Sequence, residues 1–169
     1  MAKRIMVAVL MLFAGLASAE DIPNPLIDYG AFKENVMLIG ALRDGRRVTE
    51  SEFVRMSADR ETVILDARSS QKFDLLHVKG ATNLSFPDMT AEELAKVIPS
   101  RKTRILIYCN NNFLNEPAAF PSKEIAASLN VHTITALYAY GYTNVYELGP
   151  LIDIRKTKIR FEGSTSRGS

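Results

Sequence analysis

The chain has 169 residues, with 21 Lys and Arg against 19 Asp and Glu and a formal net charge of +2 at pH 7. This near balance lacks the basic surface that nucleic-acid binding requires, so we expect no nucleic-acid partner. The length and the 47% of hydrophobic residues suit one domain with a hydrophobic core, and a single cysteine excludes an internal disulfide.

Residues 1–19 have the layout of a secretory signal peptide. Two basic residues precede an apolar stretch that ends in Ala17-Ser18-Ala19, a small-residue cleavage site. Cleavage after Ala19 would leave 150 residues, with 19 basic and 19 acidic side chains. We therefore expect an exported protein, periplasmic if the source is a Gram-negative bacterium, with no stable membrane insertion after cleavage. An uncleaved anchor is the alternative, although the apolar stretch is short for a membrane span.

Residues 20–47 form an N-terminal extension in which we expect one helix. Phe32, Val36 and Ile39 recur at helical spacing before a break at Asp44. Such spacing places all three side chains on one side of a helix.

Helices and strands then alternate along residues 48–153. Thr49 to Glu52 and Thr90 to Glu93 are capping boxes, and each predicts the start of a helix. The other predicted elements are a strand at 63–65, a helix at 70–76, a strand at 81–84, a strand at 104–108, a helix at 133–140 and a strand at 144–148. This alternation predicts an α/β fold, a three-layer parallel sheet with helices on both faces.

The last segment, residues 154–169, is rich in basic side chains. It carries five Lys and Arg against Glu162 alone and ends in Gly and Ser. We expect a basic, flexible tail whose charge belongs to a solvated chain end rather than to a binding site.

Cys109 is the residue whose position most suggests a chemical role. It directly follows the apolar run from Ile105 to Tyr108, at the carboxyl end of a predicted strand, where open parallel sheets bind their ligands. We therefore expect an accessible, reactive thiol. A buried structural cysteine is the alternative. A dithiol oxidoreductase is excluded, because the chain has no second thiol.

Four segments, in this order, resemble the rhodanese domain. They are the D-x-R of Asp66 to Arg68, the stretch from His77 to Leu84, the apolar strand that ends in Cys109, and the closing strand from Gly141 to Leu148. The resemblance covers about 48–153 and implies the same α/β fold.

The resemblance implies a sulfurtransferase. In that chemistry the Cys109 thiolate takes up a sulfane sulfur as a persulfide and passes it to a thiophilic acceptor, with no cofactor. The expected partners are thus a small sulfur donor and a thiophilic acceptor. The active-site loop would comprise Asn110, Asn111, Asn112, Phe113 and Leu114.

The three Asn residues of this loop are open to two interpretations. Asn tolerates positive φ better than other non-glycine residues, so the run would let the backbone wrap the sulfur without glycine. A plain surface turn explains the same run.

Asp66, Arg68 and His77 match family positions that we interpret as structural support near the site. Buried charges are usually paired, so ion pairs and capping are expected of them rather than catalysis. Only the geometry of the fold would make His77 a base for Cys109.

The loop also departs from the family pattern. Residues 110–121 contain no Gly, Lys or Arg, and about a dozen residues are inserted before Gly141. Thiosulfate is a dianion, so without a loop cation we expect poor activity with thiosulfate itself, unless Lys123 or His132 approaches the site.

Three alternative functions fit the sequence to different degrees. A catalytically weak module that binds a partner protein is favoured by the missing glycine and cation. A cysteine phosphatase or arsenate reductase needs an arginine fork, and no Arg lies between Asn110 and Gly141. One Cys with His77 and His132 gives no usual ligand spacing, so we expect no metal.

Overall fold

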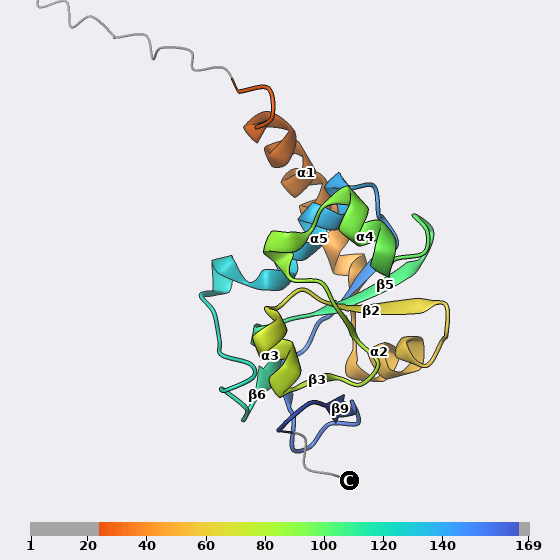
Figure 1. The fold of residues 1–169 in the computed structure, drawn as a ribbon, viewed down its shortest axis with the longest axis vertical. Coiled ribbons are helices and arrows are strands. Elements are labelled where there is room, and N and C mark those ends of the chain that lie inside the picture. Colours follow the sequence, from red (N-terminus) through yellow and green to blue (C-terminus); the bar gives the residue numbers. More distant parts are fainter. Residues whose placement is uncertain (1–23, 166–169) are drawn as a thin grey trace, which may run out of the picture.

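A sheet of five parallel strands forms the centre of the molecule (Figure 1). The computed structural model describes residues 24–165, so the expected signal peptide at 1–19 lies outside the described residues. In spatial order the strands are β1 (Arg47–Val48), β7 (Val145–Leu148), β5 (Arg104–Tyr108), β2 (Thr62–Asp66) and β4 (Thr82–Asn83). The predicted parallel α/β sheet is confirmed, with β1 as an edge strand that the sequence did not predict.

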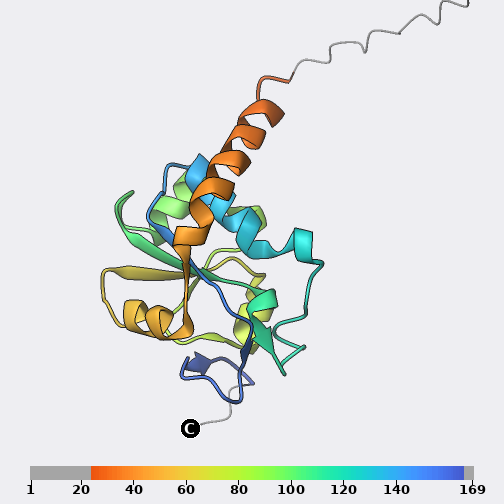
Figure 2. The same ribbon diagram turned by 180° about the vertical axis from the view of Figure 1, so that it is seen from behind.

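Helices cover both faces of the sheet (Figures 1 and 2). The helices on one face are α1 (Tyr29–Leu42), α4 (Ala91–Val97) and α5 (Leu129–Ala139), and those on the other are α2 (Glu50–Ser57) and α3 (Ser70–Leu75). In the central strand β5, Ile105 and Ile107 pack on the face that α1, α4 and α5 cover. Leu106 and Tyr108 pack on the opposite face. A strand buried on both faces has no polar alternation, which explains the continuous apolar run.

Both predicted helix starts are confirmed, with a complete capping box at Thr49 and a side-chain cap at Thr90. Thr49 Oγ1 accepts a hydrogen bond from the Glu52 amide at 3.3 Å, and the Glu52 carboxylate accepts one from the Thr49 amide at 2.9 Å. Thr90 Oγ1 accepts a hydrogen bond from the Glu93 amide at 3.2 Å. These bonds satisfy amide groups that lack partners at the start of a helix.

The segment between Cys109 and α5 is held along one end of the sheet. It contains the 3₁₀ turns η3 (Asn110–Asn112) and η4 (Ile125–Ala127) and the strand β6 (Phe113–Leu114), which pairs in parallel with β8 (Ile152–Asp153). Phe113 and Phe120 are buried with ring centroids 4.6 Å apart. Helix α5 begins at Leu129, before the predicted Thr133. Its first turn alternates apolar and polar residues, so it has no helical periodicity by which the sequence could predict it.

The expectation of a flexible tail is wrong for residues 154–165. Strand β9 (Phe161–Glu162) pairs antiparallel with β3 (His77–Val78), and Ile159 is buried in the core. The apolar side chains between the basic ones complete the face that α2 and α3 cover. Residues 166–169 lie outside the described part of the chain.

The predicted N-terminal helix is confirmed as α1, which extends away from the body of the molecule (Figure 2). Asp28 caps its first turn by accepting a hydrogen bond from the Ala31 amide at 2.8 Å. Asn35 Nδ2 donates to the Thr135 carbonyl of α5 at 2.7 Å, and Ile39 is the one residue of α1 that is buried. Within the described residues, no helix has the length and apolar character that a membrane span requires.

Candidate active site around Cys109

Cys109 lies directly after β5, at the carboxyl end of the parallel sheet, as predicted. Its side chain is 1% exposed, so the expectation of an accessible thiol is wrong for this conformation. The thiol nevertheless forms part of the wall of a cavity of about 340 Å³. Ile125 of η4 and Ser128, just before α5, line the same cavity as this side chain. A small molecule in that cavity would reach the sulfur.

The N-terminus of α5 faces the thiol. Ser128 occupies the N-cap position, and its hydroxyl makes no capping bond to the helix. Instead, Ser128 Oγ lies 3.5 Å from Cys109 Sγ. The amide groups at the start of a helix carry partial positive charge, so an anionic group bound beside Cys109 would lie at a favourable end of α5. The long insertion therefore still delivers a helix N-terminus to the cysteine.

The three asparagines fix the loop through their side chains rather than through unusual backbone angles. Asn110 to Asn112 form the turn η3, and Asn115 is the one described non-glycine residue with positive φ, at 70°. The positive-φ interpretation of the run is therefore wrong. The exposed-turn interpretation is wrong as well, because Asn110 and Asn112 are buried.

Asn112 joins the two strand ends beside the thiol. Its Oδ1 accepts hydrogen bonds from the Cys109 amide at 2.9 Å and from Asn130 Nδ2 at 3.1 Å. Its Nδ2 donates to the Leu148 carbonyl at 2.8 Å. Asn111 holds the far end of the insertion, since its amide group donates to the Lys123 carbonyl at 2.9 Å and accepts from the Lys123 amide at 3.0 Å.

Phe113 and Leu114 take no part in the cavity wall. Phe113 packs into an aromatic cluster with Tyr108, Phe120 and Phe161. Leu114 is 44% exposed on β6. Of the five predicted loop residues, the structure places Asn111 and Asn112 on the cavity wall, with Asn110 buried behind them.

Two arginines that sequence reasoning missed lie on the same cavity wall as Cys109. Arg43 belongs to the 3₁₀ turn η1 (Arg43–Arg46), and Arg47 belongs to β1. Both approach Glu147 of β7. Arg43 Nε lies 2.6 Å from Glu147 Oε1, and Arg47 Nε lies 3.9 Å from it. The loop itself supplies no cation, as the sequence indicates, and the cations on this wall come from outside the loop.

Glu147 is 1% exposed, although it carries a carboxyl group. Burial raises its pKa above the usual value for glutamate, and the guanidinium groups of Arg43 and Arg47 offset part of that rise. The sequence signal for this cluster was a glutamate within an otherwise apolar closing strand. The parallel register that sets Arg47 opposite Glu147 becomes visible only once β1 is placed beside β7.

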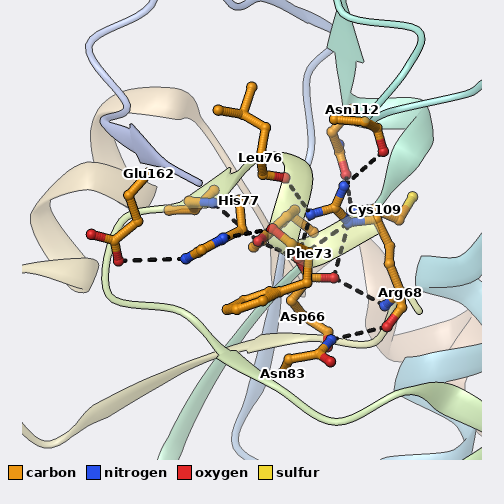
Figure 3. Close-up of polar contacts among 12 residues, drawn as sticks. Asp66, Arg68, Phe73, Leu76, His77, Asn83, Cys109, Asn112 and Glu162 are labelled. Atoms are coloured by element: carbon orange, nitrogen blue, oxygen red, sulfur yellow. Dashed lines mark hydrogen bonds and ion pairs between the residues drawn. The ribbon is translucent and has the colours of Figure 1, made fainter. Parts of the chain in front are cut away.

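Asp66 and Arg68 form a buried ion pair that ties the insertion to the sheet (Figure 3). Arg68 Nη2 lies 2.6 Å from Asp66 Oδ2, and Arg68 also donates to the carbonyls of Ala119 and Leu76 at 2.9 and 2.8 Å. The Tyr108 hydroxyl donates to Asp66 Oδ2 at 2.5 Å. Burial, and then the Asp66 charge, raise the pKa of Tyr108 well above its usual value. Through these contacts the pair holds the end of β2 to neighbouring loops, which is a structural role.

His77 is engaged with the C-terminal segment (Figure 3). Its ring stacks on Phe73 with centroids 3.6 Å apart, and its Nδ1 lies 2.7 Å from the Phe73 carbonyl oxygen. Its Nε2 lies 3.5 Å from Glu162 Oε1 of β9. These contacts use both ring nitrogens and link β3 to β9, so they do not make His77 a base for Cys109.

Lys123 and His132 do not line the Cys109 cavity. Lys123 is exposed and is held by its backbone, and His132 is exposed near Phe86 with ring centroids 6.2 Å apart. The expected approach of these two residues to the site is therefore wrong. In residues 24–165, no group of three or more His, Cys, Asp or Glu side chains is placed to bind a metal ion.

Comparison with known proteins assigns the domain to a family. The model of the rhodanese-like domain matches residues 49–149. A solution structure of a rhodanese-like domain from Anabaena sp. is 15% identical with a TM-score of 0.53, over 71% of this chain and 80% of that chain. A crystal structure of an Anabaena sp. protein is 15% identical with a TM-score of 0.50, over 69% and 91%. A rhodanese from E. coli with anions is 17% identical with a TM-score of 0.40, over 61% and 99%. No curated protein matches the sequence.

Proposed function

Because this chain belongs to the rhodanese-like domain family, we propose that it is an exported sulfurtransferase or persulfide carrier that works through Cys109. The placement of the thiol is the observation that carries this proposal. Cys109 Sγ lies 3.5 Å from Ser128 Oγ at the start of α5, on the wall of a cavity that also contains two guanidinium groups. A helix N-terminus and nearby cations are typical surroundings of cysteines that act as nucleophiles.

The proposed reaction has two nucleophilic steps. In the first, the Cys109 thiolate attacks the sulfane sulfur of a donor. A bond forms between Sγ and that sulfur, while the donor's bond to it breaks and the electron pair leaves with the donor. In the second, a thiophilic acceptor attacks the outer sulfur of the persulfide and Cys109 leaves as a thiolate. Sulfur passes from donor to acceptor, so no external oxidant or reductant is needed.

Both the thiolate and the persulfide of this reaction are anions. The N-terminus of α5 favours a negative charge at Sγ throughout, so it would lower the energy of the resting thiolate and of the persulfide alike. The cavity of about 340 Å³ suits a small donor. It also gives that donor a route to a thiol that is 1% exposed.

Intact-mass measurement tests the proposal. The protein is exposed to thiosulfate or to a polysulfide and compared with the Cys109→Ser variant treated in the same way. We expect the wild type to gain the mass of one sulfur atom and to lose it again when cyanide is added, and the variant to gain nothing. A wild type that gains no sulfur from either donor would refute a sulfurtransferase function.

A module that binds a partner protein is the second candidate function. The burial of Cys109 and the exposure of apolar side chains along α1 favour it. Such a module would take up no sulfur, and its Cys109→Ser variant would behave like the wild type. The same mass measurement therefore separates the two functions.

Export rests on the sequence of residues 1–19. N-terminal sequencing of protein from the exported fraction should begin at Glu20. Protein that keeps Met1 in the cytoplasm would contradict export, and it would leave the sulfur chemistry unaffected.

A further inference from the structure

The Cys109 cavity contains two positive charges that the family domain does not provide. Arg43 and Arg47 line it, and both precede residue 49, where the match to the rhodanese-like domain begins. They reach the cavity because β1 pairs with β7 at the edge of the sheet and η1 leads directly into β1. The loop that follows Cys109 is neutral as far as residue 115.

The charges on the cavity wall do not cancel. Glu147 is the one acidic residue among those that line the cavity in the described part of the chain, and it faces both guanidinium groups. Arg43 makes the close pair, with Nε 2.6 Å from Oε1 and Nη2 3.1 Å from Oε2 of Glu147. Arg47 is farther away, at 3.9 Å from Oε1. One positive charge therefore remains uncompensated.

Arg47 has the freedom to bind a ligand. Its side chain is 45% exposed, compared with 33% for Arg43. Its Nη2 donates a hydrogen bond to the Gly149 carbonyl oxygen at 3.1 Å, so other N–H groups of the guanidinium can face an anion.

We infer that Arg47 binds the anionic group of the sulfur donor and that Arg43 serves mainly to neutralise Glu147. This inference rests on the proposed sulfurtransferase function and names its substrate class, a small donor with an anionic group beside the sulfane sulfur. With thiosulfate, the bond that forms joins Cys109 Sγ to the outer sulfur. The bond that breaks is the S–S bond of thiosulfate, and sulfite leaves with the electron pair. Arg47 would hold the sulfonate oxygens while the charge of the thiolate approaches.

Steady-state kinetics with two donors tests this role. Arg47→Met is compared with Arg60→Met, a control because Arg60 is exposed and does not line the cavity. The donors are thiosulfate and an organic persulfide in its uncharged S–H form. We expect Arg47→Met to lower kcat/KM for thiosulfate about tenfold, mainly through KM, and to leave the uncharged donor unchanged. Arg47→Lys should restore part of the loss, because it keeps the charge without the fork.

A binding measurement keeps this test separate from the proposed function. Thiosulfate is titrated into Cys109→Ser and into Cys109→Ser combined with Arg47→Met, and amide NMR shifts are followed at low salt. We expect binding that weakens about tenfold without Arg47. Equal binding by the two proteins, no binding by either, or an Arg47→Met loss that is the same for both donors would overturn the inference. If the wild type takes sulfur from no donor, the proposed function fails while the titration still decides whether Arg47 binds the anion.

Discussion

Asp66 and Arg68 form a buried ion pair, so Asp66→Asn should lower the free energy of unfolding by about 3–5 kcal/mol. The two residues are 0% and 3% exposed, and their closest atoms are 2.6 Å apart. The substitution keeps the shape of the side chain but removes its charge, which leaves a guanidinium without a counter-charge where water does not reach. Domains of this size are stable by about 5–15 kcal/mol, so the loss would be a large fraction of the total.

Urea unfolding measures this cost, and two controls define its origin. Arg68→Met and the double variant with Asp66→Asn complete a double-mutant cycle. We expect the double variant to cost about 0.5–3 kcal/mol less than the sum of the single costs, because it leaves no unpaired buried charge. Asp59→Asn is the matched exposed control. Asp59 pairs with Arg104 at 2.9 Å, but solvent screens that pair, so its loss should have little effect.

Two results would refute the reasoning about this pair. The first is an Asp66→Asn cost as small as that of Asp59→Asn, and the second is strict additivity in the double variant. Sulfur uptake by the folded protein should also be reduced in Arg68→Met, because Arg68 donates to the Ala119 carbonyl and so positions the insertion beside Cys109. Unchanged uptake would show that the insertion keeps its position without this bond.

Three further predictions concern the C-terminal segment, the loop and the buried carboxyl. Phe161→Ala should lower the free energy of unfolding by about 2 kcal/mol, because its half-buried ring packs on Phe113 and Phe120. This loss is smaller than that expected for a fully buried phenylalanine. Urea unfolding measures the loss, and an unchanged free energy would mean that the C-terminal segment adds nothing to the core. Asn112→Ala should lower the free energy of unfolding by about 1–3 kcal/mol in the same assay and slow sulfur uptake, because it leaves the Leu148 carbonyl and the Cys109 amide without partners. An unchanged free energy of unfolding would show that these two hydrogen bonds do not hold the strand ends together. Burial raises the pKa of Glu147 in the folded state, so the folded protein binds a proton at this carboxyl more tightly than the unfolded chain does. The contribution of Glu147 to the free energy of unfolding should therefore rise as pH falls from the raised pKa to the ordinary value near 4.5. Urea unfolding of the wild type and Glu147→Gln across that pH range should show the free energy of unfolding of the wild type rising relative to that of the variant as pH falls. A fall instead would contradict the raised pKa.

The elements that sequence predicted correctly depend on local signals. Thr49 and Thr90 mark helix starts through bonds that lie within four residues. The run at 104–108 identifies a strand because both of its faces are buried. By contrast, the two-residue strands β1 and β9 have no periodicity of their own. They exist because distant partners offer backbone groups to pair with, and no short window of sequence contains that information.

The same distinction holds at the candidate site. Cys109 was predicted from its position after an apolar strand, which is a local feature. Arg47 and Glu147 are 100 positions apart in sequence, and their pairing depends on strand register. Lys123 was considered because it is near the loop in sequence, yet its amide and carbonyl groups are held by Asn111 and its side chain does not line the cavity. Nearness in sequence was a poor guide to nearness in space within an insertion of this length.

The surroundings of Cys109 are shared between the family domain and segments that flank it. A fragment limited to residues 49–149 would keep the thiol and the N-terminus of α5. It would lose Arg43 and Arg47, so Glu147 would have neither of the two cations that face it in the whole chain. The negative charge of Glu147 would then oppose an anionic donor instead of being outweighed. Family membership therefore supports Cys109 as the proposed nucleophile, whereas the positive charge that a proposed donor would meet beside it comes from residues outside the domain that defines the family.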